Sequence, residues 1–144
     1  MRIATPARVR IVLRWIQVLH SFDPFFKQAG EFRFVAIVTA HGSPPRITML
    51  PEFGHYSIGG GVAQSRIDLG AVLFEDAVNT ALTIEITGEE LDLLSRNEQL
   101  PAYRRTFNGD PSAWVGWYGP GDDAPGRDPE SLGGWRVCYV IETA

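Results

Sequence analysis

Short runs of alternating apolar and polar residues, separated by glycine and proline, constrain this chain more than any other feature of its sequence. The clearest run is LTIEIT at 82–87, in which every second residue is leucine or isoleucine. A period of two is typical of a strand with one buried side and one solvent-facing side. Comparable runs at 8–19, 31–40 and 135–142, with no long helical pattern, predict an all-β chain. We therefore expect an antiparallel, eight-stranded β-sandwich.

Shorter strands and turns fill the remainder of the chain. Shorter strands are expected at 46–50, 64–69, 72–75, 101–107 and 113–118. Turns are expected at 41–45 and 108–111, which contain glycine and proline, and one or two helical turns are expected over 89–96. The 144 residues predict a single domain spanning 1–144.

Composition limits the compartment and the partners. The single cysteine, Cys138, excludes an internal disulfide and suits a reducing compartment. The start of the chain lacks the pattern of a signal peptide, which predicts a cytoplasmic protein or one exported without a cleaved signal. The formal net charge of −4 argues against a nucleic acid partner.

An acidic segment follows the clearest strand. Gly88 is expected to end the alternation, and Glu89, Glu90 and Asp92 come within the next four residues. Such a cluster is either a solvated turn or part of a site where oxygen atoms bind a cation. Both interpretations stay open from the residues alone.

The order of the strands resembles that of a C2 domain. The strand GEFRFVAIV at 30–38 and the strand LTIEI, followed by an acidic loop, carry this resemblance. It implies an eight-stranded sandwich whose loops 20–30, 51–61 and 88–101 cluster at one pole. It also implies a binding module for phospholipid or protein that can bind Ca²⁺. The candidate calcium ligands are Asp23, Glu90, Asp92, Asn97 and Glu98.

Three phenylalanines lie in the first of these loops. Phe22, Phe25 and Phe26 either close the open end of the core or form a wedge for a membrane or a partner.

A second aromatic group, at 103–118, also allows two interpretations. Arg104 and Arg105 stand near several aromatic residues, which can stack on bases or sugars, or can pack inward from an edge strand. Trp114, Trp117 and Tyr118 are the candidate platform for a carbohydrate.

The sequence favours a binding function over catalysis. It contains no G-x-S-x-G turn and no spacing typical of a catalytic triad or a zinc site, so no enzyme is predicted. We expect a C2-like interaction module that engages a protein partner or a membrane surface. A structural subunit of a larger particle, or a homo-oligomer, is the alternative.

Overall fold

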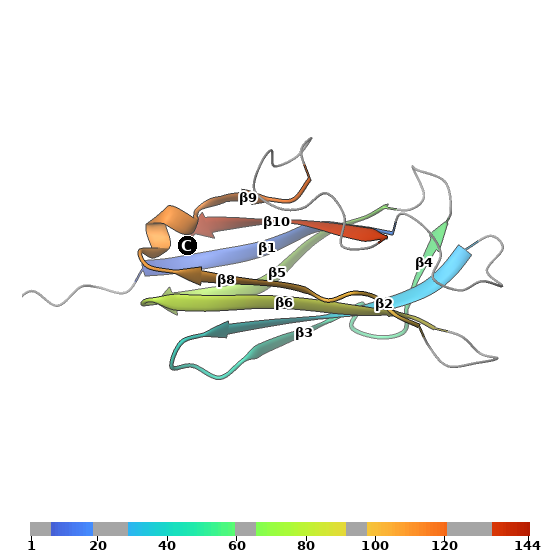
Figure 1. The fold of residues 1–144 in the computed structure, drawn as a ribbon, viewed down its shortest axis with the longest axis horizontal. Coiled ribbons are helices and arrows are strands. Elements are labelled where there is room, and N and C mark those ends of the chain that lie inside the picture. Colours follow the sequence, from blue (N-terminus) through green and yellow to red (C-terminus); the bar gives the residue numbers. More distant parts are fainter. Residues whose placement is uncertain (1–6, 19–28, 60–65, 92–97, 121–133) are drawn as a thin grey trace, which may run out of the picture.

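The fold is an antiparallel β-sandwich (Figure 1), seen in a computed structural model that describes residues 7–18, 29–59, 66–91, 98–120 and 134–144. The described elements are β1 (Ala7–Val18), β2 (Ala29–Ala40), β3 (Arg46–Leu50), β4 (Tyr56–Gly59), β5 (Arg66–Val78), β6 (Ala81–Glu90), β7 (Glu98–Gln99), β8 (Tyr103–Asn108), the 3-10 helix η1 (Pro111–Trp114), β9 (Gly116–Tyr118) and β10 (Trp135–Thr143). The all-β prediction is confirmed.

The strands form two sheets that pack face to face. Sheet A has the strand order β5-β1-β10-β9. Sheet B has the order β3-β2-β6, with β4 beside β2 and with β7 and β8 beside β6. Every pair of neighbouring strands is antiparallel. The structure adds the short strands β4 and β7 to those expected. It also joins the described part of the run 64–69, from residue 66, and the run 72–75 into the single strand β5.

Large aromatic side chains from both sheets fill the space between them. Trp135 on β10 is fully buried, and its ring centroid lies 5.6 Å from that of Phe34 on β2. The indole N–H of Trp135 donates a hydrogen bond to the carbonyl oxygen of Pro101, at 2.8 Å. The hydroxyl groups of Tyr103 and Tyr139 lie 2.5 Å apart, so these polar groups of the core also have partners.

The expected end of β6 at Gly88 is wrong, because the strand continues to Glu90. Burial alternates along the whole of β6, and Gly88 occupies an inward-facing position. A Cβ atom at Gly88 would lie only 2.5 Å from the ring of Phe34. The aromatic ring therefore occupies the space that a side chain would need. The helical turns expected from residue 89 are also wrong for Glu89 and Glu90, which lie in the strand.

A β-bulge in β1 changes which side chains face the core. Val9, Ile11 and Leu13 face sheet B, but the register shifts between Leu13 and Trp15. Trp15 consequently lies on the outer face of sheet A, although its odd number continues the inward-facing series. It is still buried, with the guanidinium carbon of Arg66 4.5 Å from its ring centroid.

Ion pairs lie along the C-terminal half of β5. Arg10 Nη2 lies 2.8 Å from Glu75 Oε1, and Arg46 Nη2 lies 2.6 Å from Asp76 Oδ2. The hydrogen bond from Arg10 lowers the pKa of Glu75. The backbone N–H of Ala77, followed by the charge of Arg46, lowers the pKa of Asp76. Both carboxyl groups therefore hold a proton less tightly in the folded chain than in the unfolded chain.

We expect these ion pairs to make stability depend on pH in the acidic range. Their contribution is present above the unfolded pKa values, which are about 4, and is lost as pH falls through the lower folded values. Thermal melts by circular dichroism at decreasing pH should show a falling Tm. The variant Glu75→Gln should show a shallower fall, and a pH profile parallel to that of the wild type would contradict this assignment.

Candidate functional site

Long connections lie at one end of the sandwich, which we call the loop pole. The C-terminal ends of β1 and β6 and the N-terminal ends of β2, β5 and β10 all meet there, as their pairing registers require. The opposite end has the short turn between β2 and β3, the turn between β5 and β6, and η1. Figure 1 shows η1 at the end away from β4. The strand ends that flank the first and third expected loops thus meet at this pole. The connection 51–55, the described start of the second expected loop, instead leaves the sheet beside β2, between the pairings of Leu50 with Phe34 and of Tyr56 with Phe32.

The loops at this pole are shorter than the resemblance implied. Gly30 belongs to β2, Gly88 belongs to β6, and the expected loop 51–61 contains β4. Residues 98–99 form β7, which pairs with the end of β6. The described connection between β3 and β4 is 51–55.

Phe53, in the connection 51–55 beside β2, is the most exposed large apolar residue among the described residues. Its side chain is 85% exposed. Gly54, with φ of +79°, follows it at a backbone conformation that favours glycine. The sequence pattern did not single out Phe53, and the three predicted residues, Phe22, Phe25 and Phe26, lie outside the described residues. The sequence signal for its exposure was its position between Pro51 and Gly54, because proline and glycine this close together indicate a turn, and a short turn does not bury a large side chain.

Two carboxylates on β2 and β6 form polar contacts near this end of sheet B. Glu89 on β6 forms an ion pair with Arg33 and accepts a hydrogen bond from Gln99, at 2.9 Å. Glu31 on β2 lies 3.5 Å from His55 Nε2. Glu89 and Glu31 thus each have a partner on a neighbouring segment.

Two of the five predicted calcium ligands lie opposite each other in this structure. Glu90 on β6 and Glu98 on β7 are partners in register, so their side chains leave the same face of sheet B. Glu98 is exposed, whereas Glu90 is only 2% exposed. The other three ligands, Asp23, Asp92 and Asn97, lie outside the described residues.

The described residues alone do not complete a calcium shell. Calcium takes six to eight oxygen ligands, and among the described residues no three acidic, histidine or cysteine side chains gather at one point. Gly88, near the position of an aspartate in the C2 pattern, has the ring of Phe34 against it. Calcium binding by these five residues stays a prediction.

The proposed carbohydrate platform is not formed. Trp114 and Tyr118 are buried, and the hydroxyl of Tyr118 donates a hydrogen bond to the carbonyl oxygen of Trp114, at 2.5 Å. Only Trp117 of the three is exposed. Arg105 packs its guanidinium carbon 4.7 Å from the ring centroid of Tyr118, which agrees with an edge strand that packs inward. A flat stacking surface of three rings is therefore absent from this part of the described chain.

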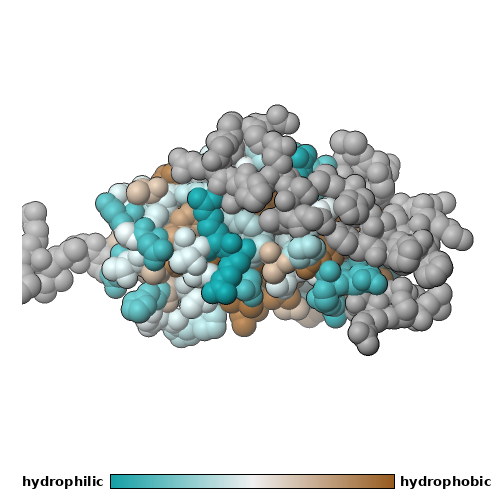
Figure 2. Space-filling model, viewed as in Figure 1, coloured by the Kyte–Doolittle hydropathy of each residue, from teal (hydrophilic) through white to brown (hydrophobic). Residues whose placement is uncertain are grey.

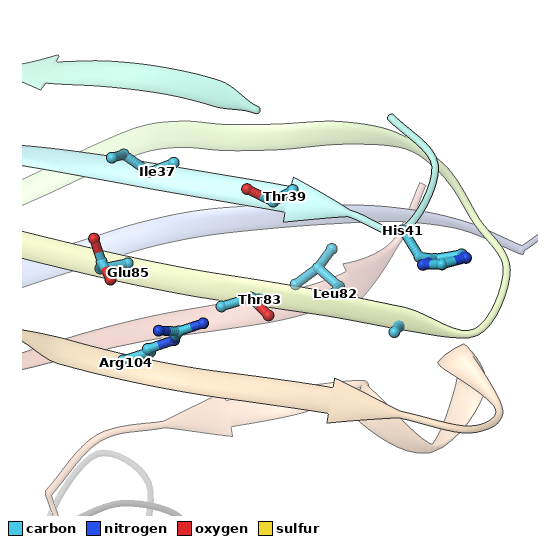
Figure 3. Close-up of a pocket in the computed structure, with 8 residues that line it drawn as sticks. Ile37, Thr39, His41, Leu82, Thr83, Glu85 and Arg104 are labelled. Atoms are coloured by element: carbon cyan, nitrogen blue, oxygen red, sulfur yellow. The ribbon is translucent and has the colours of Figure 1, made fainter. Parts of the chain in front are cut away.

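A shallow hollow of about 390 Å³ lies on the outer face of sheet B, away from the loop pole. Figure 3 shows Glu85 and Thr83 on β6 with Arg104 on β8 beneath Ile37 and Thr39 of β2. Glu85 and Arg104 are partners in register, yet they form no ion pair with any described residue. Figure 2 shows hydrophobic side chains near the middle of the lower margin of the molecule, with more hydrophilic side chains to their left. The described residues that line this open surface are apolar, polar and charged, and they do not place a nucleophile beside a base.

Comparison with known proteins shows which type of fold this chain has. No family model and no curated protein matches the sequence. A structure of CC2D1B, a protein that acts during the mitotic reformation of the nuclear envelope and has C2-like domains, matches with a TM-score of 0.53 and 11% identity. The match covers 97% of this chain and 56% of that chain.

Two further structures match over nearly the whole chain. Human GIVD cytosolic phospholipase A2 matches with a TM-score of 0.51 and 7% identity, over 98% of this chain and 18% of that chain. A C2 domain of plant extended synaptotagmin 1 matches with a TM-score of 0.48 and 8% identity, over 98% of both chains. The fold of this chain is C2-like, as the sequence resemblance predicted. The chain spans about half of the CC2D1B structure and a fifth of the phospholipase, so the match concerns their fold alone.

None of the described residues forms a helix of the length and apolar character needed to cross a membrane.

Proposed function

We propose that this chain is a non-enzymatic binding module that contacts a phospholipid surface through the loop pole. The observation that carries this proposal is the exposure of Phe53 in the connection 51–55, which leaves the sheet beside β2 and leads into β4, the strand that runs to the loop pole. Full burial of an exposed phenylalanine side chain lowers the free energy by about 1.5–3 kcal/mol, which favours its insertion into an apolar environment. Phe22, Phe25 and Phe26, in the connection between β1 and β2, are proposed to insert beside it.

Calcium is proposed as the cation that joins the acidic pole to anionic headgroups. The described carboxylates at the pole, including Glu31, Glu52 and Glu98, would otherwise repel phosphate. Glu90 and Glu98, opposite each other in register, are the described candidates for ligands. Asp23, Asp92 and Asn97 are proposed to complete the set. Carboxylate and amide oxygens are the ligands that calcium prefers.

Vesicle sedimentation tests this proposal. We expect the chain to sediment with vesicles of phosphatidylserine and phosphatidylcholine in calcium, and to stay in solution with a chelator. The variant Phe53→Asp should bind at least about tenfold more weakly, because the lost burial energy exceeds about 1.4 kcal/mol.

The matched control is Val115→Asp, which introduces the same charge at an exposed apolar residue of the opposite end. Its binding should equal that of the wild type. An equal loss of vesicle binding in Phe53→Asp and Val115→Asp would show that Phe53 has no special role in binding. No sedimentation of the wild type in calcium would overturn the membrane proposal and leave a protein partner as the ligand of this pole.

A further inference from the structure

An apolar row crosses the outer face of sheet A. Residues that are partners in register on neighbouring strands point to the same face of a sheet. Four such partners, one on each strand of sheet A, are apolar and lie outside the core between the sheets. From β5 to β9 they are Val72, Val12, Val140 and Trp117. We call these four residues the outer row.

The two ends of the outer row are open to solvent. Val72 is 49% exposed and Trp117 is 44% exposed. Val140 is half-buried, and Val12 is buried at the centre of the sheet. Exposed apolar side chains that gather in one place are typical of an interaction surface.

The flank of the outer row toward the loop pole carries more arginine than acid. Three arginines and one aspartate point outward there among the described residues, namely Arg14, Arg66, Arg136 and Asp68. Arg66 Nε lies 3.0 Å from Asp68 Oδ1, so these two charges pair. Arg14 and Arg136 form no ion pair with any described residue. This flank is therefore cationic, although the formal net charge of the chain is −4.

Contacts with aromatic rings hold both of these arginines on the outer face. The guanidinium carbon of Arg14 lies 5.6 Å from the ring centroid of Trp117, at one end of the outer row. That of Arg136 lies 5.9 Å from the ring centroid of Trp15, and Arg136 Nε donates a hydrogen bond to Gln17 Oε1, at 2.8 Å. This bond uses one N–H group, and the terminal nitrogens of a guanidinium are good donors to carboxylate oxygens. Both cations are thus positioned beside the outer row.

The charges on the opposite flank of the outer row are paired with each other. Arg10 lies there between two acids, 2.8 Å from Glu75 and 3.9 Å from Glu142. A partner would therefore meet paired charges on this flank and two guanidinium groups without an acidic partner on the other. The chemistry that fits this surface is an apolar stripe with carboxylates along one side.

The spacing of the outer row favours an α-helix that lies across the strands. Neighbouring strands are about 4.8 Å apart, so four strands span about 14 Å. A helix rises about 5.4 Å per turn, so apolar side chains on successive turns advance at nearly the spacing of the row. Side chains on one face of an extended segment are about 6.7 Å apart, which matches the row less closely.

We propose that the outer row docks an amphipathic helix of a partner protein, with acidic residues along the side of the helix that faces the loop pole. The apolar stripe of this helix packs on Val72, Val140 and Trp117, and its carboxylates pair with Arg14 and Arg136. This surface is the outer face of sheet A, so the association does not depend on the proposed membrane contact.

Calorimetric titration with a designed peptide tests this docking. The probe is a capped helical peptide of about 14 residues, with leucine along one face, glutamate along one flank and glutamine along the other. The control peptide has lysine in place of glutamate. We expect the glutamate peptide to bind, and to bind more weakly as salt rises, whereas the lysine peptide does not bind. Neither vesicles nor calcium are present, so the result is independent of the membrane proposal.

The variant Arg14→Glu should weaken binding of the glutamate peptide by about tenfold or more, because repulsion replaces an attraction. Arg14 is exposed, so its substitution leaves the fold intact. The matched control is Arg104→Glu, which makes the same charge change on sheet B, at another arginine without an ion pair to any described residue. Its affinity should equal that of the wild type. Val72→Asn removes apolar surface without a change of charge and should also weaken binding.

The indole N–H signal of Trp117 in a nuclear magnetic resonance spectrum locates the site, and its loss in Trp117→Ala assigns it. This signal should shift when the glutamate peptide is added. No binding of this peptide, equal binding of the lysine peptide, or equal losses in Arg14→Glu and Arg104→Glu would overturn the proposal.

Two other occupants of the outer row give different results. A shift of the Trp117 signal with protein concentration, without peptide, would overturn the proposal in favour of a second copy of the chain. A shift caused by replacing the carboxylates of 121–133 with amides, again without peptide, would overturn it in favour of that segment.

Discussion

Trp135→Ala should destabilise this protein by about 3–5 kcal/mol, which is the usual cost of removing a large aromatic side chain from a core. Trp135 is fully buried between the sheets and contacts the ring of Phe34. The substitution leaves a cavity that neighbours held in two sheets cannot easily fill. It also removes the hydrogen bond to the carbonyl oxygen of Pro101. Urea denaturation followed by circular dichroism measures the free energy of unfolding of the variant.

Trp117→Ala is the matched control, because Trp117 is 44% exposed on the outer face of sheet A. It loses one cation–π contact with Arg14, whose guanidinium carbon lies 5.6 Å from the ring centroid. Such exposed contacts contribute about 0.5–1 kcal/mol. If Trp135→Ala does not fold, the variant Trp135→Phe keeps most of the packing, and its smaller loss of unfolding free energy can be measured instead. Equal losses for Trp135→Ala and Trp117→Ala would contradict the described core.

Gly88→Ala should destabilise the fold by about 1–3 kcal/mol, although alanine suits a strand better than glycine does. The added methyl group would lie 2.5 Å from the ring of Phe34 and 3.3 Å from the side chain of Leu100. Phe34 is fully buried between neighbouring rings, so it cannot move aside cheaply. We expect a Tm lower by several degrees in a thermal melt, since 1 kcal/mol shifts Tm by about 2–4 °C in a domain of this size.

Gly70→Ala provides the contrast for this prediction. Gly70 lies in β5, where an added Cβ meets nothing within 4 Å. We expect its stability to be unchanged or raised by about 0.4–1 kcal/mol, since alanine restricts the unfolded chain. The two substitutions are chemically identical and differ only in their surroundings. A Gly88→Ala variant as stable as Gly70→Ala would show that Phe34 does not pack on β6 as described.

The prediction of strands succeeded where the signal was local. Apolar and polar residues alternate at 31–40, 82–87 and 135–142 because each of these strands has one buried and one exposed side. This pattern lies within each strand's own sequence. Gly88 was misassigned because an isolated glycine after a strand usually marks its end. Here the glycine makes room for a ring from the neighbouring strand β2, which lies much earlier in the chain.

The candidate site was predictable only in part. The position of Glu90 and Glu98 at one pole follows from strand order, which the resemblance supplied. The burial of Trp114 and Tyr118 and the exposure of Phe53 depend on contacts between distant segments. Composition in a local window does not distinguish a buried aromatic ring from an exposed one.

The sequence by itself determined the all-β class and the positions of the longer strands, because a period of two is a local property of the chain. It also determined that Cys138 can form no disulfide within the chain. The tertiary structure decided that Trp15 faces outward after the bulge in β1, that Phe34 covers Gly88, and that an apolar row crosses the outer face of sheet A. These features arise from the pairing of strands far apart in the sequence. Such pairings depend on register and packing across the whole molecule, which no single segment encodes.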